Sequence, residues 1–117
     1  MLDVAAIMCM SLTMFHEARG EPISGQVAVG YVLYRRADFD QKKICSETFK
    51  ADQFEWTQKT KYVPPYKTLK PFIELSQKII KQEIKDSSKG ASYFHHVSMD
   101  NQWGMKPRTI INNHIFY

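Results

Sequence analysis

The sequence predicts a mainly α domain of the α+β class, with a small antiparallel sheet near its C-terminus. Apolar residues recur at helical spacing in three segments before residue 86. After Gly90 the pattern changes to short segments rich in β-branched and aromatic residues, which is typical of strands. A chain of 117 residues is long enough to build one hydrophobic core, so we expect residues 1–117 to form a single domain.

The first predicted helix runs from Asp3 to about Ala18. Its apolar residues form one buried stripe, and Asp3 is a suitable N-cap. Gly20 and Pro22 end the helix, because glycine permits a turn and proline cannot continue a helix interior. Glu17 is therefore expected at the C-terminal end of this helix.

A second helix is predicted from about Pro22–Ser24 to Arg36. Its middle is almost entirely apolar, which indicates a central helix packed on several sides. Residues 37–66 are polar, contain prolines and predict a long irregular connection, within which Gln53-Phe54-Glu55-Trp56-Thr57 is an aromatic island. Such a connection is either a wall of a binding site or a packing loop, and the sequence favours neither.

The third predicted helix runs from about Thr68 to Lys85 and is ended by Ser87-Ser88-Lys89-Gly90. Two strands are expected after it, at residues 91–97 and 108–117. The stretch around Trp103-Gly104-Met105-Lys106-Pro107 separates them.

The charge distribution excludes some classes of partner. The net charge is +4, but the lysines are dispersed along the chain, which is typical of a solvated face and predicts no nucleic-acid partner. No apolar run approaches the roughly 20 residues of a membrane span, so no membrane insertion is expected. The N-terminal residues lack a basic region, so we expect no signal peptide.

Cys9 and Cys45 are the only cysteines, and they are too few for a zinc ribbon. Both are predicted to be buried. Their spacing leaves open whether they form a disulfide.

Glu17 is the first candidate for chemistry. A carboxyl group that follows Phe15-His16 at the end of an apolar helix is partly desolvated, which raises its pKa and keeps it protonated as a general acid. Cleavage of a glycosidic bond needs such an acid. The alternative is a surface glutamate that pairs with a lysine or arginine.

A series of motifs resembles the SleB/CwlJ-type cell wall hydrolases, a spore cortex-lytic family also found in phages. The motifs span almost the whole chain in order. They are His16-Glu17-Ala18-Arg19-Gly20-Glu21-Pro22, Gly25-Gln26-Val27-Ala28-Val29, Arg35, Cys45, Gln53-Phe54-Glu55-Trp56-Thr57, Gly90-Ala91-Ser92-Tyr93-Phe94-His95 and Asn113-His114-Ile115-Phe116-Tyr117. The sequence departs from the family pattern at Glu55, Tyr93 and Asn112, where the family commonly has Ser, His and Gly.

The resemblance implies a single catalytic domain, related to lysozyme and the lytic transglycosylases, that acts on the glycan strands of peptidoglycan. Glu17 matches the family's catalytic glutamate. The implied reaction breaks the bond between N-acetylmuramic acid and N-acetylglucosamine, with Glu17 as general acid and then base of a lytic transglycosylase. Hydrolysis by a muramidase, an amidase reaction with or without zinc, and a non-catalytic wall-binding module are the alternatives.

The resemblance also gives candidate substrate-binding residues. Aromatic rings are expected to stack on sugars, and polar side chains to bind hydroxyl or acetamido groups. The candidates are Glu21, Gln53, Trp56, Tyr93, Phe94, His95 and His114. Glu21 is the nearest second carboxylate, but Gly20 and Pro22 favour a structural role for it, pinning Arg19 or a loop.

No metal or cofactor is expected. His16-Glu17 lacks the second histidine of an HExxH motif, and adjacent strand residues such as His95 and His96 point to opposite faces. The expected partner is peptidoglycan, and the protein is expected to be monomeric. It is expected to act at the cell wall, either as a phage protein released by a holin or carried on a particle, or as a spore-associated enzyme.

Overall fold

A computed structural model describes residues 1–50, 53–101 and 103–117. Helices dominate, and the strands gather at the C-terminal end, which confirms the predicted class. The elements are α1 (Val4–Ala18), α2 (Ile23–Arg36), the 3₁₀ helix η1 (Gln41–Lys43), α3 (Ile44–Thr48), α4 (Trp56–Lys59), α5 (Tyr66–Ile80), β1 (Phe94–His96), β2 (Thr109–Ile111) and β3 (His114–Phe116).

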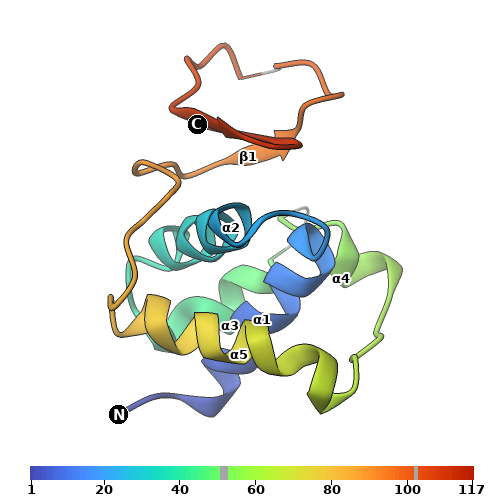
Figure 1. Cartoon of the computed structure of the whole chain (residues 1–117), viewed down its shortest axis with the longest axis vertical. Helices are drawn as coiled ribbons and strands as arrows, with labels where there is room; N and C mark the ends of the chain where they lie inside the picture. Colours follow the sequence, from blue (N-terminus) through green and yellow to red (C-terminus); the bar gives the residue numbers. More distant parts are fainter. Residues whose placement is uncertain (51–52, 102) are drawn as a thin grey trace.

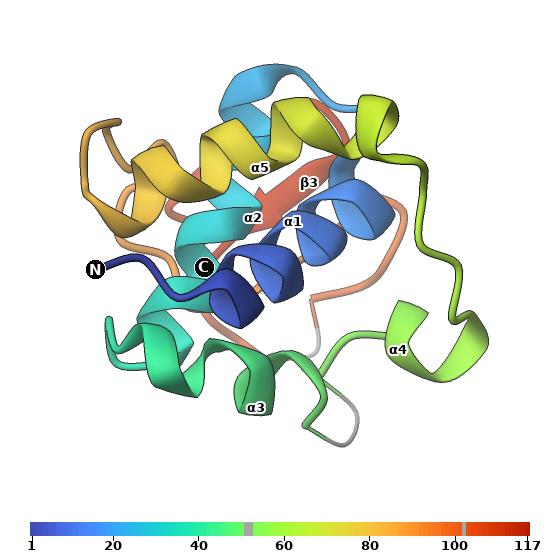
Figure 2. The ribbon, with the colours of Figure 1, turned by 90° about the horizontal axis from the view of Figure 1, so that it is seen from below.

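Helix α2 is central, as its apolar middle predicts. The sheet lies on one side of it and the other helices lie on the opposite side (Figure 1). Seen from below, α1 runs between α3 and α5, and it packs against both and against α2 (Figure 2). A Cβ at Gly30 of α2 would lie 2.6 Å from Ile79 Cδ1 and 3.0 Å from Met14 Sδ, so a larger residue there would require these side chains to shift.

The first two helices begin and end close to the predicted positions. The Asp3 side chain caps α1 by accepting a hydrogen bond from the Ala6 N–H, at 3.2 Å. Pro22 precedes the first turn of α2. Helix α1 ends at Ala18, which places Glu17 in its last turn.

Helix α5 starts earlier and ends earlier than the predicted range of residues 68–85. It begins directly after Pro65 and stops at Ile80, because Gln82 takes a left-handed conformation with φ 56°. The Gln82 N–H donates to the Ile79 carbonyl, and the Glu83 N–H donates to the Lys78 carbonyl. This pair of bonds is a Schellman motif, which ends the helix without a glycine.

The prediction of an irregular connection over residues 37–66 was wrong in part. Three short helices, η1, α3 and α4, lie within it. The Asp40 carboxylate starts the first of them by accepting from the Lys42 N–H, at 3.0 Å. Helices this short leave little periodic signal in a sequence, since each makes only one turn or slightly more.

The sheet has three strands where two were expected. Its order is β1-β3-β2 and all pairing is antiparallel. The predicted strand over residues 108–117 is a hairpin in which Ile111 pairs with His114. The two-residue turn between them contains Asn112 at φ 49°, a conformation that asparagine tolerates better than most residues.

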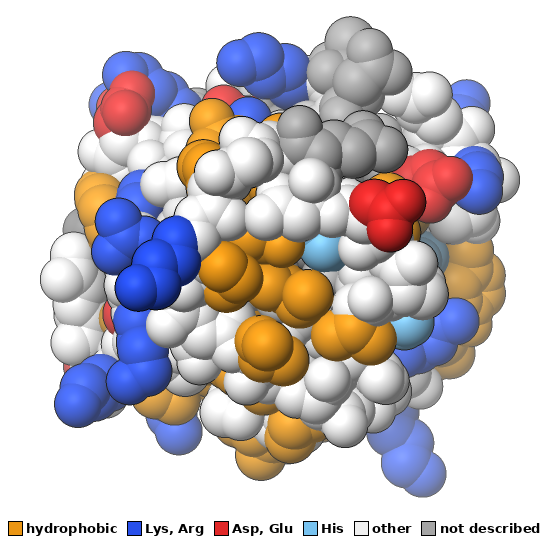
Figure 3. Space-filling model, turned by 90° about the horizontal axis from the view of Figure 1, so that it is seen from above, with side chains coloured by type: hydrophobic (Ala, Val, Ile, Leu, Met, Phe, Trp, Pro, Cys, Tyr) orange, Lys and Arg blue, Asp and Glu red, His pale blue; other side chains and the backbone are white. Residues whose placement is uncertain are grey.

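The face of the molecule on the sheet side has a distinct surface pattern. A hydrophobic patch lies at its centre with histidine side chains beside it, and Lys and Arg side chains gather along one side of the patch (Figure 3). In the described part of the chain, no helix is both long enough and apolar enough to cross a membrane.

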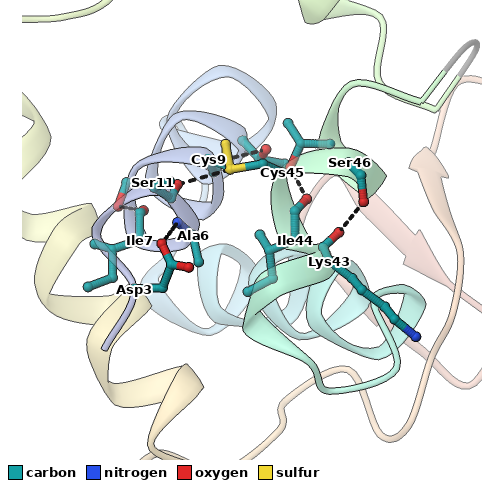
Figure 4. Close-up of a disulfide and its surroundings, with 12 residues drawn as sticks. Asp3, Ala6, Ile7, Cys9, Ser11, Lys43, Ile44, Cys45 and Ser46 are labelled. Atoms are coloured by element: carbon teal, nitrogen blue, oxygen red, sulfur yellow. Dashed lines mark hydrogen bonds between the residues drawn. A yellow bond between two sulfur atoms is a disulfide. The ribbon is translucent and has the colours of Figure 1, made fainter. Parts of the chain in front are cut away.

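Cys9 and Cys45 form a disulfide, which the sequence had left open. The bond joins α1 to α3 across a sequence separation of 36 residues, with the two Cα atoms 5.4 Å apart (Figure 4). It holds α3 against the first half of α1. Helix α3 lies within the connection over residues 37–66, so the bond fixes part of that connection to α1.

Candidate active site

A cleft of about 650 Å³ opens between the end of α1, the segment before α4, and the sheet. We call it the Glu17 cleft. It brings together six of the predicted site residues: Glu17, Gln53, Tyr93, Phe94, His95 and His114. Two other predicted residues, Glu21 and Trp56, are not among its lining residues.

Glu17 lies in the wall of this cleft, where its side chain is partly buried. Burial disfavours the charged carboxylate, and the negative charge of Glu55 adds to the effect, so the pKa of Glu17 rises to about 7. A carboxyl group with this pKa is protonated in a large fraction of molecules at neutral pH. It can therefore donate a proton and accept one back within one reaction cycle.

Glu55 is the second carboxylate of the cleft, and the sequence analysis had recorded it only as a departure from the family pattern. It is exposed and pairs with Lys59 on the next turn, with Oε1 2.6 Å from Nζ. An exposed pair of this kind contributes little to stability. The effect of Glu55 on the cleft is electrostatic, because its charge helps to keep Glu17 protonated.

Replacing Glu55 with glutamine should move the alkaline limb of the activity profile to lower pH. Removal of the neighbouring negative charge lowers the pKa of Glu17, so less of the acid form remains above pH 7. We expect a loss of about two- to threefold in kcat at pH 8 and little change at pH 6. The measurement is kcat against pH, with Glu74→Gln on α5 as the charge-matched control. A limb that stays in place, or moves to higher pH, would contradict this electrostatic link.

Glu21 is occupied by the β2–β3 turn. Its carboxylate accepts hydrogen bonds from the Asn113 N–H at 3.0 Å, the Asn112 side chain at 3.0 Å and the Asn113 side chain at 3.2 Å. Desolvation opposes its charge, but these bonds and His114 outweigh that effect and hold the pKa of Glu21 below its ordinary value. Glu21 therefore holds the turn of the hairpin, in line with the structural role expected for it. Its carboxylate, which was also a candidate for binding substrate, makes these hydrogen bonds with the turn instead.

His114 lies between this carboxylate and the cleft. The residue is 7% exposed, and its Nδ1 is 3.6 Å from Glu21 Oε1, slightly beyond hydrogen-bond distance. Desolvation lowers the pKa of His114, against the opposing effect of Glu21 and with a contribution from His96 and His95. The imidazole is therefore neutral at neutral pH and can offer one donor and one acceptor.

His95 is also buried, and both of its ring nitrogens are used within the protein. Nδ1–H donates to the His96 carbonyl at 2.8 Å, and the Tyr117 hydroxyl donates to Nε2 at 2.9 Å. In this arrangement neither nitrogen is free for a sugar. His96 is exposed while His95 is buried, the alternation expected of adjacent strand residues, and both line the cleft.

An aromatic rim surrounds His95. The Trp103 ring lies 5.4 Å from the Tyr93 ring, 5.2 Å from the His95 ring and 5.1 Å from the Tyr117 ring, measured between centroids. Trp103 and Tyr93 are 44% and 41% exposed. Exposed rings held by other rings are suited to stacking on the apolar faces of sugars.

Trp56 contacts the residue before the candidate acid instead of lining the cleft. Its ring stacks on His16 with centroids 4.5 Å apart and planes 15° apart. His16 Nε2 lies 3.0 Å from the Tyr62 carbonyl oxygen, so the stack ties residues 56–62 to the end of α1. Trp56 thus supports the position of the last turn of α1, in which Glu17 lies.

Several lining residues were missed by the sequence analysis. They are Val32, Arg36, Phe54, Glu55, Ser92, His96, Met99 and Trp103. Glu55 and His96 adjoin predicted residues, so a wider reading of the same motifs would have included them. Trp103 lies in the connection between β1 and β2, outside every predicted helix and strand. No local pattern therefore indicated that it would contact Tyr93.

Within residues 1–50, 53–101 and 103–117, no group of three or more His, Cys, Asp or Glu side chains is arranged to hold a metal ion.

The chain is similar to known proteins in sequence and in fold. A model of the family described as Cell Wall Hydrolase matches residues 20–117, a match that begins three residues after Glu17. Among solved structures, the chain is similar to the crystal structure of the catalytic domain of the Bacillus cereus SleB protein. The identity is 24% and the TM-score 0.79, with 99% of this chain and 91% of that chain covered. This likeness shows the fold, and it confirms the predicted lysozyme-like α+β class. No curated protein matches the chain.

Proposed function

The chain belongs to the cell wall hydrolase family and degrades peptidoglycan, and from this premise we propose that it is a lytic transglycosylase with Glu17 as its general acid and base. The substrate bond joins N-acetylmuramic acid to N-acetylglucosamine. The observation that carries the proposal is the partly buried position of Glu17 in the wall of the cleft, which raises its pKa to about 7.

In the first step, the protonated Glu17 donates to the glycosidic oxygen while the bond to the muramyl C1 breaks. The leaving sugar departs as an alcohol, and positive charge develops at C1. In the second step, the Glu17 carboxylate accepts the proton of the muramyl C6 hydroxyl as O6 bonds to C1. The product is a 1,6-anhydromuramyl end, and no water is consumed. One carboxyl group with a pKa near neutrality serves both steps.

The rest of the cleft supports the binding of a glycan strand. The exposed rings of Trp103 and Tyr93 offer stacking surfaces, and Gln53 offers an amide to hydroxyl and acetamido groups. His114, neutral and buried at the cleft wall, offers an imidazole. Phe94 packs behind it, with ring centroids 5.1 Å apart.

Muramidase hydrolysis is the second candidate, and Glu55 is the observation that favours it. Hydrolysis by inversion or retention normally uses two carboxylates, and Glu55 lines the same cleft as Glu17. In that reaction Glu55 would activate a water molecule or stabilise the charge at C1. The products would then carry reducing ends.

Mass spectrometry of the released muropeptides tests both candidates. Purified peptidoglycan is digested in H₂¹⁸O with the wild type, Glu17→Gln, Glu55→Gln and the control Glu74→Gln. The proposal expects unlabelled anhydro ends from the wild type, Glu55→Gln and Glu74→Gln, and none from Glu17→Gln. Labelled reducing ends that disappear in Glu55→Gln would assign hydrolysis instead. Anhydro ends formed equally well by Glu17→Gln would overturn the role of Glu17.

A further inference from the structure

A second, smaller pocket adjoins the Glu17 cleft. Its volume is about 340 Å³, and it is lined by Ser92, Tyr93, Met105, Lys106, Arg108 and Tyr117. We call it the cationic pocket. It shares Ser92 and Tyr93 with the cleft, so one continuous surface leads from the catalytic wall into the pocket.

The two hollows differ in the charged side chains that line them. The Glu17 cleft is lined by two carboxyl groups, Glu17 and Glu55, and by one cation, Arg36. Among the described residues that line the cationic pocket, two are cations and none has an acidic side chain. Lys and Arg side chains gather beside the hydrophobic patch on the same face of the molecule as the sheet (Figure 3). An anionic group is therefore favoured in the pocket over the cleft.

The framework of the pocket is held by the backbone. The Ser92 and Tyr93 N–H groups donate to the Tyr117 carbonyl at 2.7 and 3.2 Å, and the Arg108 N–H donates to the Phe116 carbonyl at 2.7 Å. Arg108 Nη1 also donates to the Lys89 carbonyl at 3.3 Å, which restrains the guanidinium. A restrained guanidinium loses less side-chain entropy when it binds a carboxylate.

A third cation, Arg36, lines the Glu17 cleft and contacts the two residues that the hollows share, Ser92 and Tyr93. The Arg36 guanidinium lies 4.7 Å from the centre of the Tyr93 ring and donates to the Ser92 carbonyl at 3.3 Å. Glu47 offsets part of its charge, with a separation of 3.4 Å. Arg36 thus fixes the shared wall and adds to the positive potential at the junction.

The proposed substrate has an anionic branch in the right place. A muramyl residue can bear a stem peptide on its lactyl group, and that peptide carries free carboxylates. Three extended residues reach about 10 Å from the sugar. A peptide that leaves a muramyl residue in the cleft can therefore enter a hollow that shares two lining residues with it.

We propose that the cationic pocket is a subsite for the carboxylates of the stem peptide, so that the enzyme prefers glycan strands that carry peptides. This rests on the proposed function, since it requires a muramyl residue in the Glu17 cleft. Lys106 and Arg108 provide the charges, and Tyr93 and Tyr117 provide the apolar wall against the peptide.

The experiment compares two substrates prepared from the same Gram-negative sacculi, which contain no teichoic acid. One is intact, and in the other an amidase has removed the stem peptides. The enzymes are the wild type, the double variant Lys106→Gln/Arg108→Gln and the charge-matched control Lys70→Gln/Lys78→Gln on α5. Thermal melts establish that the variants fold. Initial rates of glycan cleavage give kcat/KM for each pair.

We expect the double variant to lose about fivefold in kcat/KM on intact sacculi and nothing on stripped sacculi, while the control matches the wild type on both. Equal losses on both substrates, or no loss on either, would overturn the proposal. Teichoic-acid-bearing walls form a further arm: a loss confined to them would assign the pocket to phosphate and also overturn it. Failure of the proposed function is distinct, since the wild type would then leave both glycans uncleaved.

Discussion

The Glu17→Gln variant should lose at least about a thousandfold in kcat/KM on peptidoglycan and should still bind it. Glutamine keeps the size and hydrogen-bonding capacity of the side chain but cannot donate or accept the proton that bond cleavage requires. The measurement is the initial rate of glycan cleavage together with co-sedimentation on insoluble peptidoglycan. Unchanged cleavage would contradict the assignment of Glu17, and loss of both cleavage and binding would indicate a disturbed fold.

The same substitution should stabilise the protein above neutral pH. Burial raises the pKa of Glu17 from 4.5 to about 7, so the folded state resists the ionisation that the unfolded chain undergoes freely. The free energy of unfolding of the wild type therefore decreases as the pH rises from about 4.5 through 7. The full shift corresponds to about 3 kcal/mol, and partial solvent contact makes this an upper value.

Urea unfolding at pH 4 and pH 9 measures this effect. Glu17→Gln and the wild type should differ little at pH 4, where both side chains are neutral, and the variant should be more stable at pH 9. Glu74→Gln, at an exposed position on α5, should show no such pH dependence. A difference between Glu17→Gln and the wild type that is the same at both pH values would arise from packing, and it would contradict the raised pKa.

The helical part of the fold was predictable because its signals are local. An apolar stripe with Asp3 at its start located α1, and Pro22 located the start of α2. The end of α5 was not predictable, since its apolar pattern continues to Ile84 while the chain turns at Gln82. A left-handed glutamine has no sequence signature, because the turn depends on tertiary contacts.

The hairpin shows the same limit. Residues 108–117 read as one strand because β-branched and aromatic residues lie on both sides of Asn112, and asparagine alone is a weak turn signal. What completes the turn is Glu21, which is distant in sequence and binds both Asn112 and Asn113. A long-range contact of this kind decides the structure without appearing in a local pattern.

The candidate acid was predictable from the end of a helix and from the family motif, but its surroundings were not. The sequence placed Trp56 among the sugar-binding residues, whereas its ring stacks on His16 and supports α1. The sequence analysis recorded Glu55 only as a departure from the family pattern. In the folded protein its negative charge raises the pKa of Glu17. Which carboxylates share a cleft is set by packing between segments far apart in sequence.

Loss of the Cys9–Cys45 disulfide should destabilise the protein by about 4 kcal/mol, since the bond closes a loop across 36 residues and restricts the unfolded chain. For a domain of this size that corresponds to a decrease in Tm of about 15 °C. The variant Cys9→Ala/Cys45→Ala avoids burying a new hydroxyl group at the position of Cys9, which is 9% exposed. Thermal melts of the variant and the wild type measure the difference.

Reduction of the wild type distinguishes the stability that the disulfide bond contributes from the stability that the packing of the two sulfur atoms contributes. Dithiothreitol should lower the Tm of the wild type nearly to that of the double variant and should leave the variant unchanged. Activity should decrease in parallel near the reduced Tm, because α3 is the anchor of the chain that leads to Gln53 and Glu55 at the cleft wall. If dithiothreitol leaves the wild type unchanged while alkylation of the unfolded protein finds two free thiols, the cysteines are not bonded in the folded protein. A Tm decrease in the variant alone would then be the effect of a cavity at Cys9.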